Sequence, residues 1–372
     1  MQALFDNLSE NKSKKLVVLG MGGTIAGTAN AAATGAAGDD GNLAYTAAQL
    51  GVEALLKALP GRADLPFELV SEQVAQLDSK DMDFAVWRAL ALRVRHHLLQ
   101  PDVTGVVITH GTDTLEETAF FLLQVLPAEL LKAKPVVITC AMRPATSPDA
   151  DGPQNLRDAL TLAGAPAAQG VMAVCAGRIH AALNVQKVHP YRLNAFDSGD
   201  AASLGQIQGG AVQWTAVAAT AAFTASAAFT ESVAPATAPP QATVASLLLD
   251  DLTAATVWPR VEIVMSHAGA SGLLVDALLA SPSPSAVKGS QASPLRGIVV
   301  AGTGNGSVHQ VLEAALVRAQ AAGVRVWRST RCAYGAVQAV PGSRLPEVTA
   351  LAPAKARIAL MLALLQHDQR RR

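Results

Sequence analysis

Apolar residues along this chain occur in two kinds of block: short Val- and Ile-rich runs, and longer stretches with helical spacing. The short runs end at glycine or polar residues, which is typical of strands buried in a parallel sheet. These runs span residues 15–20, 105–111, 135–140 and 171–177. Between them, helices are predicted over residues 83–99, 115–126 and 155–163. The order strand, helix, strand predicts an α/β fold with a larger N-terminal parallel-sheet domain and right-handed crossovers.

The alternation stops near residue 198 and returns near residue 258. The intervening chain is rich in Ala, Thr, Ser, Gly and Pro, and the prolines of APATAPP (234–240) are incompatible with a helix interior. Beyond it, strands are predicted over 260–272, 296–307 and 323–330, and helices over 311–322 and 353–366. We therefore predict an N-terminal α/β domain over 1–197, an Ala- and Pro-rich linker region over 198–257, and a smaller C-terminal α/β domain over 258–372.

Composition narrows the classes of function. The 372 residues include 29 Lys or Arg and 29 Asp or Glu, so the formal net charge is zero. Because no basic excess attracts phosphates, no nucleic-acid partner is expected. No apolar run reaches the roughly 18 residues of a membrane span, so no membrane partner is expected either. The first residues lack the apolar core of a secretory signal, and a cytoplasmic location is therefore expected unless a signal has been removed.

The cysteines offer no obvious chemistry. Cys140, Cys175 and Cys332 are far apart in the sequence, and the first two fall in apolar stretches. An odd number without paired spacing is typical of reduced core thiols rather than of disulfides or a zinc site. No cluster of His, Cys and carboxylates has the spacing of metal ligands. We expect neither a metal nor another cofactor.

A glycine-rich segment, GMGGTIAGTA (20–29), follows the first predicted strand and surrounds the hydroxyl of Thr24. It lacks the lysine of a phosphate-binding loop, and Ile25 stands where a dinucleotide fingerprint needs its last glycine. Taken alone, the segment fits a tight turn as well as a place where a ligand approaches the backbone. In the second interpretation Thr24 is a nucleophile, and nearby N–H groups hold an oxyanion.

A second polar loop, THGTDTLEET (109–118), joins a predicted strand to a predicted helix. Thr114 and Glu117 have capping-box spacing, so the helix is expected to begin there. Thr112 and Asp113 then lie at the carboxyl end of the strand, either as further capping residues or as part of a site. His110 is expected to orient this loop through hydrogen bonds.

Together the two loops resemble the bacterial L-asparaginase family, chiefly its class II, asparaginase/glutaminase-like members. The most specific matches are GGTIAG (22–27) and THGTDTLEETAFFL (109–122). Further matching segments are YTAAQLGVEALL (45–56), DSKDM (78–82), AMRPATSPDADGPQNLRDA (141–159), AGTGNG (301–306) and RSTRCAYGA (328–336). The resemblance covers most of the chain and is weakest between about residues 195 and 258.

The resemblance implies an amidohydrolase that converts L-asparagine to L-aspartate and ammonia through an acyl-enzyme, with L-glutamine as a second candidate substrate. Thr24 matches the nucleophile, and Tyr45 matches the tyrosine that assists it. Thr112, Asp113 and Lys187 match a second catalytic set, in which the aspartate also receives the substrate α-amino group. The implied substrate-binding positions are Gly23, Ser79, Lys80, Gly111 and Asp113. The resemblance also implies a homotetramer built as a dimer of dimers.

Some positions depart from the family pattern. Lys80 stands where class II members usually have Gln, and it could hold the substrate α-carboxylate, shift substrate preference or face solvent. Gly269 stands where those members carry an Asn near the neighbouring subunit's site. Both differences leave open a glutaminase-leaning amidase and a non-catalytic amino-acid-binding sensor. Residues 28–42 are small and Gly-rich, which predicts a lid that closes over the substrate.

Overall fold

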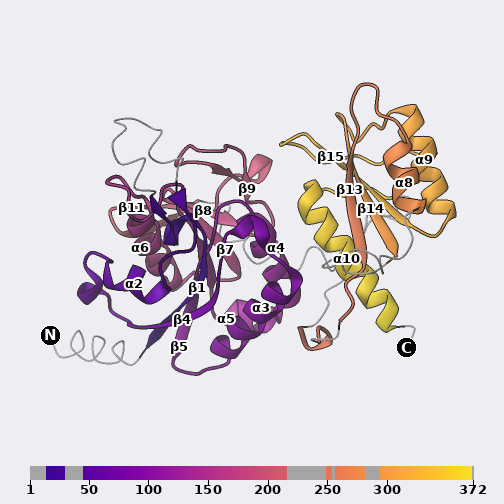
Figure 1. Cartoon of the computed structure of the whole chain (residues 1–372). Coiled ribbons are helices and arrows are strands. Elements are labelled where there is room, and N and C mark those ends of the chain that lie inside the picture. The colour runs from indigo at the N-terminus through magenta and orange to yellow at the C-terminus, as the bar shows by residue number, and fades with distance from the viewer. Residues whose placement is uncertain (1–13, 30–44, 216–248, 254–255, 281–293, 371–372) are drawn as a thin grey trace. The chain divides into compact units, whose positions relative to one another are not determined.

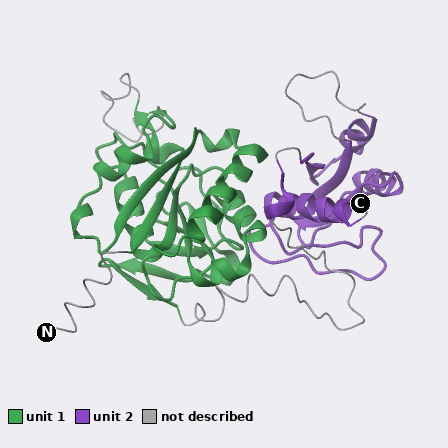
Figure 2. Cartoon of the chain, turned by 90° about the horizontal axis from the view of Figure 1, so that it is seen from below, with its two compact units in different colours: residues 1–226 green, residues 227–372 purple. Residues whose placement is uncertain are grey.

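The structure, a computed structural model, describes residues 14–29, 45–215, 249–253, 256–280 and 294–370. Internal contacts divide the chain into two compact units, residues 1–226 and 227–372 (Figure 2). Most of the predicted lid and most of the predicted linker lie outside the described residues. Across the described ranges, no helix is long and apolar enough to cross a membrane.

An eight-stranded sheet forms the centre of the N-terminal unit (Figure 1). In spatial order its strands are β12 (Ala211–Trp214), β11 (Gly205–Gln208), β8 (Arg178–Ala181), β7 (Val171–Cys175), β6 (Val136–Thr139), β5 (Val103–Thr109), β1 (Lys15–Gly22) and β4 (Glu68–Leu77). The strands from β7 to β4 run parallel, whereas β8, β11 and β12 pair in antiparallel fashion. The predicted parallel strands correspond to β1, β5, β6 and β7, which confirms the α/β class.

Helices cover both faces of this sheet, as the continuous apolar character of its strands requires. They are α2 (Val52–Lys57), α3 (Phe84–Leu98), α4 (Leu115–Val125), α5 (Ala128–Ala133) and α6 (Gly152–Ala163). Helices α2 and α6 pack on one face around a core that includes Leu16, Leu156 and Met172. The opposite face is covered by α3 and α4 (Figure 1). Between these two helices the ring of Trp87 stacks on that of Phe121, with centroids 5.0 Å apart.

Parallel pairing brings the carboxyl ends of three strands to one edge of the sheet. Strand β1 lies between β4 and β5, and Gly20 is opposite both Gln73 of β4 and Thr109 of β5. The loops that follow these strands therefore emerge side by side, which is where open α/β sheets bind ligands. They carry the GGTIAG, DSKDM and HGTD segments of the sequence.

The N-terminal sheet continues past residue 197, the predicted end of the first domain. Strands β11 and β12 form a hairpin that pairs with β8 through β11. The hairpin turns at Gly209 and Gly210, whose φ angles of 59° and 75° suit glycine. This hairpin falls in the predicted linker region because of the surrounding Ala- and Pro-rich composition, and each of its strands has only four residues.

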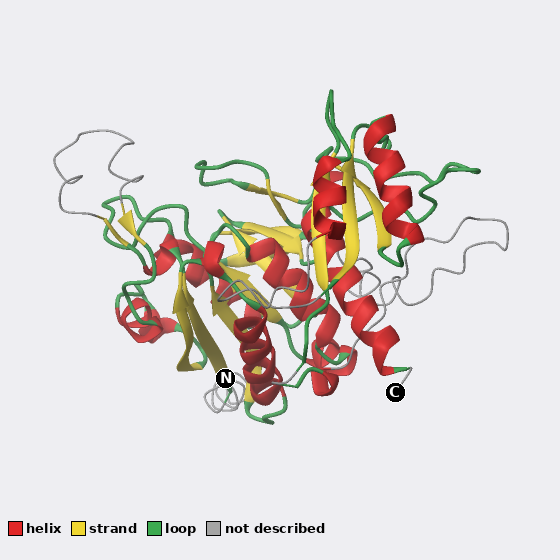
Figure 3. Cartoon of the chain, turned by 45° about the vertical axis from the view of Figure 1, so that its right-hand side comes forward, coloured by secondary structure: helices red, strands yellow, loops and turns green. Residues whose placement is uncertain are grey.

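The C-terminal unit is a smaller α/β layer structure, as predicted. Its parallel strands are β13 (Arg260–Met265), β14 (Leu295–Gly302) and β15 (Arg325–Thr330). Its helices are α8 (Leu273–Ala280), α9 (Gln310–Ala321) and α10 (Pro353–Gln369). Helices α8 and α9 lie on one face of the three-stranded sheet, and α10 lies on the other (Figures 1 and 3). Just after β15, Cys332 is exposed, so the expectation of a core thiol is wrong at this position, whereas Cys140 and Cys175 are buried.

Candidate active site

Thr24 follows β1 in a sharp turn that glycine makes possible. Gly22 and Gly23 have φ angles of 95° and 78°, in the region that other residues rarely adopt. A Cβ atom on Gly23 would collide with the backbone of Gly111, so the turn after β1 touches the loop after β5 backbone to backbone. This close approach places the segment of Thr24 directly against the segment of Thr112. Packing therefore requires glycine at both predicted substrate-binding positions, Gly23 and Gly111, whatever these residues contact in a substrate.

Tyr45 is the hydrogen-bonding partner of Thr24. Its phenolic oxygen lies 2.8 Å from Oγ1 of Thr24, and either atom can be the donor. Tyr45 begins the short strand β3 (Tyr45–Thr46), which pairs with β2 (Thr28–Ala29) shortly after the Thr24 turn. Thr24 is 6 % exposed. The hydroxyl of a buried threonine therefore has a phenol as its hydrogen-bonding partner.

A second hydroxyl is held by an ammonium group. Nζ of Lys187 donates to Oγ1 of Thr112 at 2.8 Å and to Oδ1 of Asp113 at 2.6 Å. The Lys187 side chain is 18 % exposed and that of Asp113 is 52 % exposed. An ammonium donor draws electron density from the hydroxyl oxygen, and the carboxylate balances the charge. The structure thus brings together the three predicted residues of this set, which come from β9 (Gln186–Lys187) and from the loop after β5.

Glu116, a residue that the sequence analysis missed, holds the backbone of Lys187. Its Oε2 accepts the Lys187 N–H at 2.6 Å from the first turn of α4. Among the described strands, β9 pairs only with β10 (Phe196–Asp197), so this carboxylate is a second point of attachment for a short element. Acidic residues are common in a helix first turn because they suit its dipole. No sequence signal therefore distinguished Glu116.

Ser79 joins the loop after β4 to the loop after β5. Its Oγ accepts the N–H of Asp113 at 3.3 Å, and its carbonyl oxygen accepts the hydroxyl of Thr114 at 2.8 Å. Helix α4 begins at Leu115 after Thr114, as predicted, but the Thr114 side chain makes no capping bond. The expected capping-box contact is wrong because the Thr114 hydroxyl donates to Ser79 instead. A Cβ atom on Gly111 would collide with the Ser79 side chain, so these loops are closely packed.

Lys80 is engaged by carboxylates of its own turn. Its Nζ lies 2.5 Å from Oδ2 of Asp78 and 3.3 Å from Oδ2 of Asp81, and its side chain is 61 % exposed. The hydrogen bond to Asp78 raises the pKa of Lys80, so the side chain is a cation at neutral pH. The charge is next to Ser79 on the short helix η5 (Ser79–Asp81).

His110 is completely buried behind the loop that carries Thr112 and Asp113. Its Nδ1 lies 2.7 Å from the carbonyl oxygen of Gly111, and its Nε2 lies 3.0 Å from Oγ1 of Thr118. Burial lowers the pKa of His110 to about 4. The expected role in orienting the loop agrees with these contacts, and the buried ring is not available to a substrate.

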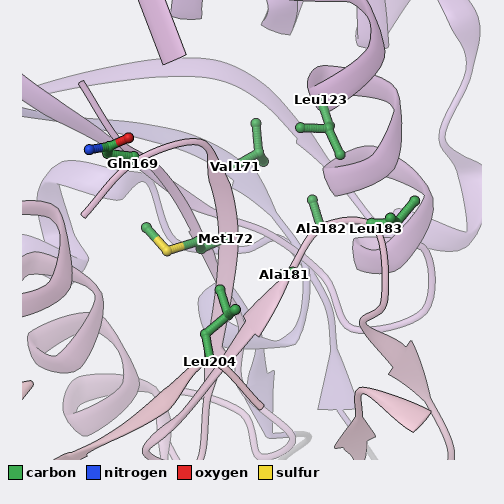
Figure 4. Close-up of a pocket in the computed structure, with 8 residues that line it drawn as sticks. All are labelled: Leu123, Gln169, Val171, Met172, Ala181, Ala182, Leu183 and Leu204. Carbon is green, nitrogen blue, oxygen red and sulfur yellow. The ribbon is translucent and has the colours of Figure 1, made fainter. Parts of the chain in front are cut away.

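A pocket elsewhere in the N-terminal unit is too small for an amino acid. Its lining residues are Leu123, Gln169, Val171, Met172, Ala181, Ala182, Leu183 and Leu204 (Figure 4). Its cavity volume is about 10 Å³, which corresponds to about one water molecule. None of these residues belongs to the threonine site.

Among the side chains that the structure describes, no group of three or more His, Cys, Asp and Glu could hold a metal ion.

Comparison with known proteins matches both units to one family. The family profile "Asparaginase, N-terminal" matches residues 15–219, and the profile "Glutaminase/Asparaginase C-terminal domain" matches residues 260–372. The chain is 35 % identical to L-asparaginase 2 of Bacillus subtilis over 354 residues, covering 93 % of this chain and 81 % of the relative. It is 34 % identical to the glutaminase-asparaginase of Acinetobacter glutaminasificans, covering 94 % of each chain. The crystal structure of a probable cytoplasmic L-asparaginase from Campylobacter jejuni superposes with a TM-score of 0.75 at 33 % identity, covering 94 % of this chain and 95 % of that one.

Proposed function

The chain belongs to the asparaginase family of amide hydrolases, and from that premise we propose that it converts L-asparagine to L-aspartate and ammonia through an ester formed on Thr24. In the first step Oγ1 of Thr24 attacks the side-chain amide carbon. The C–N bond breaks once the nitrogen has received a proton, and ammonia leaves. Water then hydrolyses the aspartyl ester and regenerates the hydroxyl.

Tyr45 takes part in the first step by moving a proton. A threonine hydroxyl is a weak nucleophile until its proton is removed, and a standing tyrosinate is scarce at neutral pH. The 2.8 Å contact between Thr24 and Tyr45 supports a relay in which the phenol receives the hydroxyl proton while its own proton moves on toward the leaving amide nitrogen. N–H groups of the glycine-rich turn would stabilise the oxyanion that forms.

Thr112, Lys187 and Asp113 form the second proton-handling set. The carboxylate of Asp113 lies 2.6 Å from Nζ of Lys187 and is a charged partner for the lysine. We therefore propose that proton transfer accompanies attack, either directly through Thr112 or through a water. The ammonium stabilises negative charge on the Thr112 oxygen while that transfer takes place.

Two exposed charged side chains, Asp113 and Lys80, would orient the substrate. The half-exposed carboxylate of Asp113 would receive the substrate α-ammonium group. Lys80, exposed and adjacent to Ser79, would hold the α-carboxylate after exchanging its longer contact with Asp81. The backbones of Gly23 and Gly111 meet next to Ser79, and they would contact the amide end of the substrate.

The observation that carries the proposal is the pairing of each predicted threonine with its own proton partner, Thr24 with Tyr45 and Thr112 with Lys187. The test is ammonia release from L-asparagine, L-glutamine and D-asparagine by purified protein. Release from L-asparagine should fall by at least about 10³-fold in Thr24→Ala and in Thr112→Ala. Thr161→Ala is the matched control, because the Thr161 hydroxyl donates to the carbonyl oxygen of Arg157 in its own helix, α6, away from the site.

The same assay separates the alternatives. Faster release from L-glutamine would identify a glutaminase-leaning amidase, in line with the name of the Acinetobacter relative. Tight binding of L-asparagine without ammonia release would identify an amino-acid-binding sensor and overturn the proposed hydrolysis. A covalent aspartyl adduct on Thr24, trapped by acid quenching and located by peptide mass spectrometry, tests the ester separately.

We also propose a homotetramer, a dimer of dimers, and a cytoplasmic location. The first is supported by exposed apolar side chains on the C-terminal unit, among them Met265 and Leu273. The second is supported by the similarity to the probable cytoplasmic enzyme from Campylobacter jejuni. Cell fractionation tests the location, and recovery in a periplasmic extract would contradict it.

A further inference from the structure

Two thiols face each other at the carboxyl ends of β6 and β7. Cys140 directly follows β6, and Cys175 is the last residue of β7. Thr139 is opposite Val174 in the parallel pairing, so the two cysteines occupy the next opposed positions. Their sulfur atoms lie 3.3 Å apart, and the residues are 1 % and 4 % exposed. The threonine chemistry proposed above uses neither of them.

The backbone around the two thiols is already fixed. Nδ2 of Asn155 donates to the carbonyl oxygen of Cys140 at 3.0 Å, and its Oδ1 accepts the N–H of Ala176 at 3.0 Å. The Asn155 side chain of α6 thus hydrogen-bonds the backbone at the carboxyl ends of both β6 and β7. Neighbouring strands lie about 4.8 Å apart, and disulfides span Cα separations of roughly 4.4–6.8 Å. The expected spacing of these two positions therefore lies within the range that a disulfide spans.

Hydrogen bonding and burial both act on the Cys140 thiol. The hydrogen bond to Cys175, together with burial, raises the pKa of Cys140 well above its usual value. Either sulfur can be the donor of the 3.3 Å contact. In the step proposed below, Cys175 attacks the oxidant, and Cys140 is the second thiol beside it. Burial slows the first step, and the adjacent thiol intercepts the product before further oxidation.

We infer that Cys140 and Cys175 form a modification site, at which hydrogen peroxide converts the two thiols into a reversible disulfide between β6 and β7. Cys175 loses its proton and attacks one peroxide oxygen; the O–O bond breaks, which leaves a sulfenic acid on Cys175 and releases one water. Cys140 then attacks that sulfur; the S–S bond forms, and the sulfenic oxygen leaves as a second water with the Cys140 proton. The two thiols lose two electrons, and the peroxide gains them.

The expected consequence is stabilisation. The disulfide joins residues 35 positions apart and so restricts the unfolded chain. We expect the melting temperature to rise by roughly 5–10 °C. Because Asn155 already holds both strand ends in place, ammonia release from L-asparagine is expected to stay unchanged.

The experiment uses the full chain with Cys332→Ser, which removes the exposed thiol and leaves the core pair. The protein is incubated with hydrogen peroxide at mildly alkaline pH. It is then unfolded in denaturant that contains an alkylating reagent but no reductant, so that every remaining free thiol is labelled. The intact mass is measured afterwards. The expected product has lost the mass of two hydrogen atoms, carries no alkyl group and reverts with dithiothreitol. Cys140→Ser and Cys175→Ser in the same background are controls that cannot form the bond and should not gain melting temperature.

Two outcomes would overturn the inference. One is a peroxide-treated protein that still accepts two alkyl groups. The other is addition of oxygen to the sulfurs without loss of the two hydrogens. Both outcomes are read from the protein mass. They are therefore independent of the proposed amide hydrolysis, which is measured by ammonia release.

Discussion

At the scale of single residues, the hydrogen bonds around His110 determine which of its ring nitrogens carries the proton. The carbonyl oxygen of Gly111 can only accept, so Nδ1 carries the hydrogen of that 2.7 Å contact. Nε2 must then accept from the hydroxyl of Thr118, whose oxygen in turn accepts the indole N–H of Trp87 at 2.8 Å. Every donor and acceptor in this buried chain is satisfied only while His110 is neutral.

The first prediction concerns stability against pH. Burial lowers the pKa of His110 to about 4 in the folded protein, whereas an unfolded histidine titrates near about 6.5. Between these values the unfolded chain binds a proton that the folded chain does not. The contribution of His110 is therefore complete above about pH 6.5 and is lost as the pH falls toward about 4, amounting to about 3 kcal/mol. The measurement is the free energy of unfolding in urea from about pH 7 to about pH 4.5.

The control for that prediction is His110→Gln, which removes the titrating group. The variant is expected to be less stable at neutral pH because it loses part of the buried chain of hydrogen bonds. It should nevertheless lose less stability than the parent protein as the pH falls. An identical decline in the two proteins would show that carboxylates elsewhere, and not His110, cause the acid sensitivity.

At the scale of secondary-structure elements, the position of Lys187 depends on the start of α4. The carboxylate of Glu116 holds the Lys187 N–H at 2.6 Å, and the lysine side chain then reaches Thr112 and Asp113. A charge-assisted hydrogen bond to the backbone fixes the direction of a two-residue strand more firmly than its pairing with β10 alone. Glu116 is thus a positioning residue that acts through Lys187.

The second prediction is a loss of turnover in Glu116→Ala. We expect kcat for L-asparagine to fall by roughly 10- to 100-fold, with a smaller change in KM, because proton transfer depends on the Lys187 geometry more than binding does. Glu116→Gln retains an acceptor oxygen and should recover part of the loss. Glu129→Ala is the matched control, since Glu129 also lies in the first turn of a helix but is exposed and pairs with Lys132. Equal kcat in Glu116→Ala and the parent would remove the positioning role.

The secondary-structure elements also differ in how well the sequence predicts them. The long apolar strands and the helix over 83–99, observed as Phe84–Leu98, were predictable because their patterns are strong and local. The β11–β12 hairpin was missed although its Gly209–Gly210 pair is a turn signal, because the surrounding composition suggested a linker. The contact of Lys187 with Thr112, 75 positions away, came from family resemblance alone. No local pattern reports a contact over that separation, and none marked Glu116.

At the scale of the whole molecule, the C-terminal unit exposes apolar side chains on strand β13 and helix α8. Strand β13 is at one end of its sheet, and no described strand pairs with its outer edge. Ile263 and Met265 of that strand are 39 % and 54 % exposed, and Leu273 and Leu274 of α8 are 75 % and 55 % exposed. An open strand edge can pair with another chain, and exposed apolar side chains beside it favour such an association. This surface is the physical reason to expect self-association.

The third prediction is that Met265→Lys breaks the assembly. Light scattering at micromolar concentration should give the parent protein four times the 38.3 kDa chain mass, and a charge placed on the β13 edge should reduce that mass. Leu99→Lys is the control, because Leu99 is 58 % exposed in the N-terminal unit and should leave the mass unchanged. Circular dichroism should be alike in all three proteins, since Met265 is half exposed and contributes little to the core. A parent protein that remains a monomer, or a tetramer that tolerates the lysine, would place any interface elsewhere on the chain.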